Sequence, residues 1–137
     1  MRILGLDVGD KRIGLALSDP TLSIAQSLKL HVRGSLESDL KALKQLVEEH
    51  DVGTIVVGLP RNLNGTMGRR ARDIESLAEA LREFIAIPVV LWDERFSTNE
   101  AHRIFDMAQV TQKKRKPYLD MMASQIILQG YLDAQKP

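Results

Sequence analysis

Hydrophobic residues gather in three short runs near the start of the chain, at residues 2–8, 12–18 and 24–32. Only Gly9-Asp10-Lys11 separates the first two runs, and such a tight, glycine-containing connection is typical of a β-hairpin. The third run alternates less regularly between apolar and polar residues. The pattern therefore predicts three strands, of which the first two are antiparallel.

The middle of the chain alternates between helical periodicity and uniformly apolar runs. Apolar residues recur at helical spacing after Gly34-Ser35 and again after a polar loop at 60–70. Residues 54–59 and 88–92 are apolar throughout, as expected for strands buried on both faces. Two amphipathic helices and two buried strands are therefore predicted. The apolar faces of the helices are Leu36, Leu40, Leu43 and Val47, then Ile74, Leu77, Ala78, Leu81 and Ile85.

Two further helices are predicted beyond residue 94. Ser97 and Glu100 have the spacing of a capping box, which opens a helix, and Pro117 suits the first turn of a last helix after a basic gap at 109–116. The element order is then β-β-β-α-β-α-β-α-α. Strand-helix-strand units imply parallel neighbours, whereas the opening hairpin implies an antiparallel edge. We therefore predict an α/β fold with a mixed five-stranded sheet and flanking helices.

Composition limits the possible classes of protein. A chain of 137 residues suits a single domain spanning 1–137, and 44% hydrophobic residues suffice for a core. The absence of cysteine excludes disulfides, thiolate zinc sites and cysteine nucleophiles. No apolar stretch approaches the roughly 20 residues that span a bilayer, and no signal-peptide pattern follows Met1, so no membrane association and a cytoplasmic location are expected. The formal net charge of +1 means that any nucleic-acid binding must depend on local charge.

Four acidic residues are candidates for a common site. Asp7 ends the first predicted strand, Asp93 and Glu94 end the last, and Asp120 lies in the first turn of the final helix. Ligands of such sheets bind at the carboxyl ends of the parallel strands, so these acids can converge there. Because clustered carboxylates repel one another, a divalent cation would stabilise them, and oxygen ligands suit Mg²⁺ or Mn²⁺. Two ions about 4 Å apart can activate a water for phosphodiester cleavage.

Each acid also has a simpler interpretation. Asp7 is costly to bury in an apolar strand unless it is paired or metal-bound, which favours function. Asp93 and Glu94 point to opposite faces of a strand, so only one is expected as a primary ligand, and either can pair with Arg95. Asp120 can simply stabilise the helix, because an acidic residue in the first turn interacts favourably with the helix dipole. The pattern alone leaves these alternatives open.

Four motifs in order resemble the YqgF/RuvX family over essentially the whole chain. One departure from the usual family pattern lies after Asp120, where the family has paired alanines and this chain has Ala123 followed by Ser124. The motifs are Asp7-Val8-Gly9-Asp10-Lys11-Arg12-Ile13-Gly14-Leu15-Ala16-Leu17-Ser18-Asp19, Val57-Gly58-Leu59-Pro60 with Asn62 and Gly65, Asp93-Glu94-Arg95-Phe96-Ser97-Thr98, and Asp120 with Ala123 and Ile126-Ile127-Leu128-Gln129-Gly130-Tyr131-Leu132.

The resemblance implies an RNase H-like fold and a metal-dependent nuclease. Family members are assigned to 5′-end processing of the 16S ribosomal RNA precursor, and the alternative is resolution of Holliday junctions in branched DNA. By residue match, Asp7, Glu94 and Asp120 take the catalytic and metal-binding roles, with Asp93 as the alternative to Glu94. The expected cofactor is Mg²⁺ or Mn²⁺, with two ions. The protein is expected as a monomer or a homodimer, and paired incision of a junction favours a dimer.

Basic residues near the predicted acids indicate a nucleic-acid partner. The densest group lies just ahead of the helix that carries Asp120, where it can hold a phosphodiester backbone, although such runs are often only solvated loops. Few aromatic residues are available for base stacking, so sequence-specific reading of single strands is not expected. The predicted nucleic-acid-binding residues are Lys11, Arg12, Asn62, Arg69, Arg70, Arg95, Lys113, Lys114, Arg115 and Lys116.

Two other classes of protein share some of these features. Sugar kinases and actin-like ATPases also place an Asp and a glycine-rich hairpin first, but they close two domains around a nucleotide, and this chain is too short. A P-loop is excluded because Leu15-Ala16 replaces the required Lys-Ser/Thr. A catalytically silent nucleic-acid-binding protein remains an alternative to the nuclease, and the retained acids argue against it.

Overall fold

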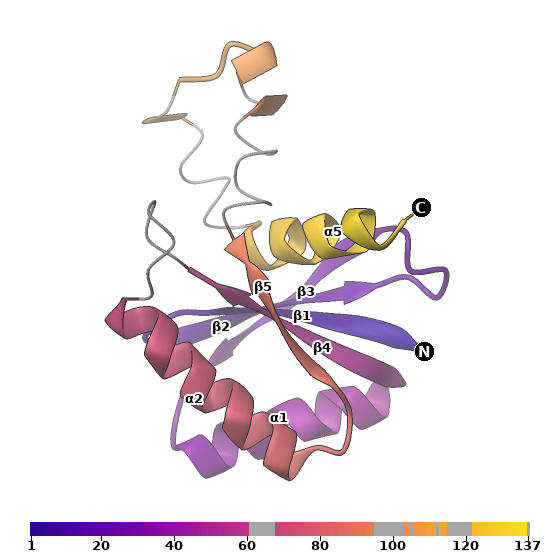
Figure 1. The fold of residues 1–137 in the computed structure, drawn as a ribbon, viewed down its shortest axis with the longest axis vertical. Coiled ribbons are helices and arrows are strands. Elements are labelled where there is room, and N and C mark those ends of the chain that lie inside the picture. The colour runs from indigo at the N-terminus through magenta and orange to yellow at the C-terminus, as the bar shows by residue number, and fades with distance from the viewer. Residues whose placement is uncertain (61–67, 95–102, 105, 112, 115–121, 137) are drawn as a thin grey trace.

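The fold is built on a mixed five-stranded sheet (Figure 1). The computed structural model describes residues 1–60, 68–94, 103–104, 106–111, 113–114 and 122–136. The strand order is β3-β2-β1-β4-β5, with β2 antiparallel to β1 and β3, and with β4 parallel to β1 and β5. The predicted sheet and its antiparallel edge are therefore confirmed. The strands are β1 Arg2–Val8, β2 Arg12–Ser18, β3 Ala25–Val32, β4 Val52–Leu59 and β5 Val89–Asp93.

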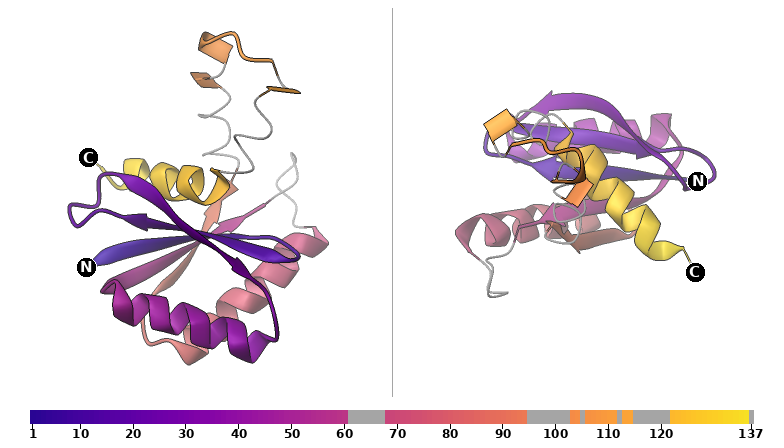
Figure 2. Two further views of the ribbon diagram at one scale, coloured as in Figure 1. Left: turned by 180° about the vertical axis from the view of Figure 1, so that it is seen from behind. Right: turned by 90° about the horizontal axis from the view of Figure 1, so that it is seen from above.

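Helices cover both faces of the sheet (Figures 1 and 2). Helices α1 (Leu36–Glu49) and α2 (Arg69–Phe84) lie on one face, and α5 (Ala123–Gln135) lies on the other. The predicted start of α1 is confirmed, because the Ser35 hydroxyl accepts a hydrogen bond from the Ser38 N–H at 3.1 Å. The predicted capping box at Ser97 and the predicted helix start at Pro117 lie outside the described residues.

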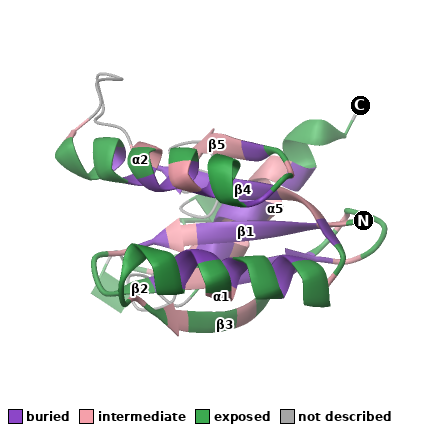
Figure 3. Cartoon of the chain, turned by 90° about the horizontal axis from the view of Figure 1, so that it is seen from below, coloured by how far each residue is buried: buried purple, intermediate pink, exposed green. Residues whose placement is uncertain are grey.

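The two faces of β1 pack into different hydrophobic clusters. Leu4, Leu6 and Val8 belong to the larger cluster beneath α1 and α2, where buried residues line the inner sides of both helices (Figure 3). Ile3 belongs to the smaller cluster under α5. Because side chains alternate along a strand, Asp7 lies on the same face as Ile3, beneath α5.

Helix α5 packs very closely against the sheet. A Cβ atom added at Gly5 would lie 2.8 Å from the Cβ of Leu128, so a side chain at this position would push the helix away. Trp92 is only half-buried because β5 is an edge strand, and it packs edge-on against Tyr131 with 5.6 Å between ring centroids. The close approach fixes the height of α5 above β1, and thereby above Asp7.

A buried carboxylate ties α1 to the segment that follows β3. Asp39 is 2% exposed, and its Oδ1 accepts a hydrogen bond from the Gly34 N–H at 2.9 Å and lies 2.8 Å from His31 Nε2. The Arg33 Nε lies 3.9 Å from Oδ2. Burial raises the pKa of Asp39, but the Gly34 N–H, His31 and Arg33 together outweigh burial and lower it. His31 therefore has a structural role.

Replacing Asp39 with alanine is expected to destabilise the fold by about 3 kcal/mol, because it leaves buried donors and charges without their partner. The pKa of Asp39 is depressed in the folded state, so its contribution is present above the unfolded pKa, near 3.8, and is lost as the pH falls further. Urea unfolding at neutral pH and near pH 3 measures both effects. Glu37→Ala is the control on the same helix, since its pair with Lys41 is exposed. Equal losses in both variants would contradict the assignment.

Candidate active site

Asp7 lies at the carboxyl end of β1, next to β2 and the start of α5. It is the register partner of Gly14, and a Cβ added at Gly14 would lie 3.7 Å from the Asp7 Cβ and 3.5 Å from the Ser124 Oγ. A groove of about 190 Å³ opens beside these three residues. Gly14 therefore leaves room next to the Asp7 carboxyl that a larger residue would fill. The groove is lined by Asp7, Gly14, Leu15, Ser27, Leu28, Lys29, Leu30 and Ser124.

Glu94 follows β5 directly and carries an unusual carboxyl group. Its Oε1 is buried and finds no hydrogen-bond partner in the described part of the chain. Burial, together with the nearby charge of Asp7, raises the pKa of Glu94 to about 7; the Arg70 guanidinium acts in the opposite direction, and Asp93 raises the pKa further. Asp7 and Glu94 thus come from different strands and repel each other electrostatically.

This pair of carboxyls fits a cation site. A buried carboxylate oxygen without a donor is costly, and a second carboxylate nearby increases the cost. A divalent cation would remove both penalties, and carboxylate oxygens are the ligands that Mg²⁺ and Mn²⁺ prefer. Within the described ranges, His, Asp and Glu side chains form no cluster of three that could hold a metal. Asp120, the third predicted ligand, lies outside those ranges.

Gly58 on β4 makes room for Glu94, and the sequence-based prediction did not single it out as a site residue. A Cβ at this position would lie 2.7 Å from the Glu94 Oε1 and 2.5 Å from the Ile127 Cδ1. A glycine inside an otherwise apolar, buried strand is a signal that could have found the position, since such a glycine often marks a close approach, but it does not say which residue approaches. Gly58 therefore sets where the Glu94 carboxyl lies.

Gly58→Ala is expected to lower nuclease activity by at least about tenfold and to destabilise the fold by about 1–3 kcal/mol, because the added methyl displaces Glu94 or Ile127. Gly53→Ala is the matched control on the same strand. The three atoms nearest to its added Cβ all belong to the side chain of Met1, which is 79% exposed and can move. Cleavage rates and urea unfolding of both variants provide the comparison. Equal activity of the two variants would contradict this role of Gly58.

The structure places only some of the predicted basic residues. The Arg70 Nη2 donates a hydrogen bond to the Val8 carbonyl at 3.1 Å, directly after Asp7, and Arg70 also acts on Glu94. The predicted residues at four other positions lie outside the described ranges: Asn62, Arg95, Arg115 and Lys116. The remaining five are exposed: Lys11, Arg12, Arg69, Lys113 and Lys114.

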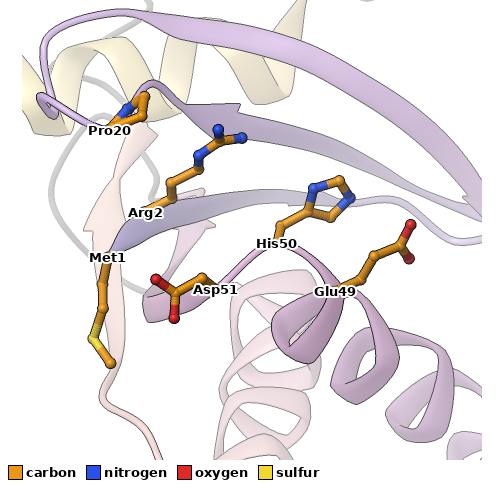
Figure 4. A pocket seen from close by; sticks show the side chains of 6 residues that line it. All are labelled: Met1, Arg2, Pro20, Glu49, His50 and Asp51. Atoms are coloured by element: carbon orange, nitrogen blue, oxygen red, sulfur yellow. The ribbon is translucent and has the colours of Figure 1, made fainter.

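A larger cavity of about 430 Å³ lies at the other end of the sheet (Figure 4). It is formed where β1 begins and α1 ends, and Arg2 and His50 are among its lining residues. None of the predicted site residues lines it. The cavity is therefore separate from the candidate site at the carboxyl end of β1.

Comparison with known proteins identifies the family. The family model described as "RuvX: Holliday junction resolvase" matches residues 1–134. The chain belongs to this RuvX family. The resemblance seen in the sequence motifs is thereby confirmed, and with it the assignment of this RuvX chain as a nuclease, a hydrolase.

Relatives of this RuvX chain match it end to end. A protein of Thermoanaerobacter pseudethanolicus is 47% identical over 137 residues, covering 99% of both chains. A protein of Geobacillus kaustophilus is 47% identical over 138 residues, covering 99% of this chain and 100% of the relative. Both carry the name "Putative pre-16S rRNA nuclease".

Solved structures confirm the RNase H-like fold. RuvC of T. thermophilus, in complex with a Holliday junction substrate, aligns with a TM-score of 0.63 at 13% identity, covering 98% of this chain and 95% of RuvC. The fowlpox virus Holliday junction resolvase aligns with a TM-score of 0.53 at 12% identity, covering 98% of this chain and 99% of the resolvase. At such identities the likeness shows the fold. Among the helices of the described ranges, none has the length and apolar character needed to cross a bilayer.

Proposed function

We propose that this RuvX chain trims the 5′ end of the 16S ribosomal RNA precursor by hydrolysing a phosphodiester bond, with Mg²⁺ or Mn²⁺ as cofactor. The observation that carries the proposal is the Glu94 carboxyl beside Asp7, whose buried Oε1 accepts no hydrogen bond from any residue that the structure describes. The names of the full-length relatives supply the substrate. Processing of this RNA would place the protein in the cytoplasm.

Asp7 and Glu94 would hold the cation, with Asp120 as the third ligand. Once bound, a pair of divalent ions supplies an activated water and stabilises the leaving oxygen. Glu94 must lose its proton before it can serve as a ligand, and the nearby Arg70 charge favours that loss. The groove next to Asp7 and Gly14 would give a phosphate access to the Asp7 carboxyl.

Exposed basic residues would bind the nucleic-acid backbone. Lys11 lies in the turn that follows β1, Arg12 begins β2, and Arg69 and Arg70 begin α2. Contacts to phosphates position a strand without reading its sequence. Lys113 and Lys114, with Asn62, Arg95, Arg115 and Lys116, are proposed as further contacts of this kind.

Resolution of a Holliday junction is the second candidate function, because the family model carries that description. Symmetric incision of a junction needs two copies of the active site, so this candidate also requires a homodimer. The RNA-processing function is compatible with a monomer.

A side-by-side cleavage assay tests the proposal. The substrates are an RNA covering the 5′ end of the 16S precursor, a four-way DNA junction and an unstructured RNA, each with Mg²⁺, Mn²⁺ or EDTA. The proposal expects metal-dependent cleavage of the precursor RNA at a defined position. Preferred cleavage of the junction by a dimer, seen by light scattering, would favour the second candidate. Binding of either substrate without cleavage would support a silent nucleic-acid-binding protein.

A further inference from the structure

Two arginines from distant parts of the chain hold the backbone that follows Asp7. The Arg33 Nη1 donates a hydrogen bond to the Gly9 carbonyl at 2.8 Å, and the Arg70 Nη2 donates to the Val8 carbonyl at 3.1 Å. Arg33 follows β3, whereas Arg70 lies in the first turn of α2. The two guanidinium groups therefore meet on the loop between β1 and β2.

Both arginines line a notch of about 170 Å³. A guanidinium has five N–H donors, and each of these groups uses only part of its set on the loop carbonyls. The remaining donors can serve a ligand in the notch. The notch is lined by Val8, Gly9, Asp10, Arg33, Arg70, Asp73 and Ile74.

The charges around the notch leave the arginines available to an anion. Asp10 and Asp73 also line it, but both are exposed, and among the described residues neither forms an ion pair with Arg33 or Arg70. Asp39 is an ion-pair partner of Arg33, but its Oδ2 lies 3.9 Å from the Arg33 Nε, too far for a hydrogen bond, and its Oδ1 is held by His31 and Gly34. A guanidinium group can bind phosphate with two parallel hydrogen bonds, which fix both the position and the orientation of the phosphate.

We propose that the Arg33–Arg70 notch binds a backbone phosphate next to the one that is cleaved, and so determines which bond reaches the carboxyls. Val8 and Gly9 directly follow Asp7, and the Arg70 charge also acts on Glu94, so the notch lies at the same end of the sheet as the proposed cation site. Nucleic acid as the source of this phosphate depends on the proposed function. Phosphate binding itself does not, because it follows from the two arginines.

Titration with inorganic phosphate tests the notch without any cleavage. The full chain is followed by NMR at its arginine Nε–H signals, in the absence of metal. Saturable shifts of the Arg33 and Arg70 signals are expected, with the Arg2 signal unchanged, and Arg33→Gln should abolish the Arg70 shift. Arg2 is a suitable reference because it lines the cavity at the other end of the sheet. Absent shifts, or equal shifts of all three arginines, would overturn the proposal.

Substrates with a single neutral methylphosphonate linkage test the position of the phosphate. Binding of the precursor RNA is measured in the Asp7→Asn background, so that the strand stays intact. One neutral linkage beside the cleavage position should weaken binding about tenfold, and Arg33→Gln should have the same effect and reduce the salt dependence by about one charge. The two changes together should weaken binding no further, because they remove the same contact.

The variant Arg2→Gln removes the same charge and should change binding less than about twofold. If the loss of affinity from the neutral linkage and the loss from Arg33→Gln multiply wherever the linkage is placed in the RNA, the two changes act on different contacts and the proposal is wrong. Phosphate binding in the notch by a protein that cuts none of the substrates would contradict the proposed function and support the notch.

Discussion

Asp7→Asn is expected to lower the rate of metal-dependent cleavage by at least about a thousandfold. The substitution keeps the size of the side chain but removes a charged oxygen ligand at the carboxyl end of β1. Mn²⁺ binding, measured by calorimetry, should be lost together with activity. Full activity with Mg²⁺, or unchanged Mn²⁺ binding, would rule out a catalytic cation at Asp7.

The folded state should tolerate this substitution. The Asp7 charge raises the pKa of Glu94, so removing it relieves repulsion rather than core packing. We expect the metal-free variant to unfold in urea at a concentration no lower than that of the wild type. Asp51→Asn is the control, since it removes one carboxylate at the opposite end of the sheet. Asp51 has a φ of 52°, a conformation that asparagine tolerates well, so activity and stability should both stay close to the wild type.

Local pattern was sufficient to predict most of the sheet. Val52–Leu59 is apolar on both faces because helices cover both sides of β4, and this gives the uniform run seen in the sequence. The edge strand Ala25–Val32 has exposed residues on both sides, which explains its weak alternation. Asp7 was equally visible, because an acid ending an apolar strand breaks the pattern. These features depend on neighbours in the sequence or on one packed layer.

The rest of the candidate site depends on contacts between distant segments. Nothing near Gly58 in the sequence indicates that its missing side chain makes room for Glu94, which follows a different strand. Arg33 has no special pattern around it, and its link to the Gly9 carbonyl appears only once the loop after β3 lies against the first hairpin. The preference for Glu94 over Asp93 as the proposed ligand likewise depends on a structural observation, because the Glu94 Oε1 is buried without a hydrogen-bond partner among the described residues.

Glu94→Gln is expected to abolish cleavage and yet to stabilise the metal-free protein at alkaline pH. The amide has nearly the same shape as the carboxyl but provides no charged ligand, so activity should fall by at least about a thousandfold. The glutamine side chain is also neutral, so the electrostatic repulsion from Asp7 is removed. Urea unfolding in EDTA, at about pH 5 and about pH 8.5, separates the two effects.

The pH dependence follows from the raised pKa of Glu94. In the unfolded chain this carboxyl has a pKa near 4.5, whereas in the folded protein it has a pKa of about 7. The folded state therefore holds a proton that the unfolded state has released, and stability falls as the pH rises through this window, by on the order of 2–3 kcal/mol. The glutamine variant should lack this slope, so the two proteins should differ little near pH 5 and most above pH 7. Parallel pH profiles would contradict a buried, proton-holding Glu94.

Cation binding to the wild type should be coupled to the loss of the Glu94 proton. A metal ligand must be deprotonated, so Mn²⁺ should displace up to one proton per chain at about pH 6 and almost none at about pH 8.5. Calorimetry in buffers with different ionisation enthalpies measures this release directly. Because Glu94 is the group whose pKa is raised near Asp7, Mn²⁺ affinity should increase as the pH rises toward 7 and then level off. A pH-independent affinity would mean that the cation does not use the Glu94 carboxyl, even if the protein cleaves RNA.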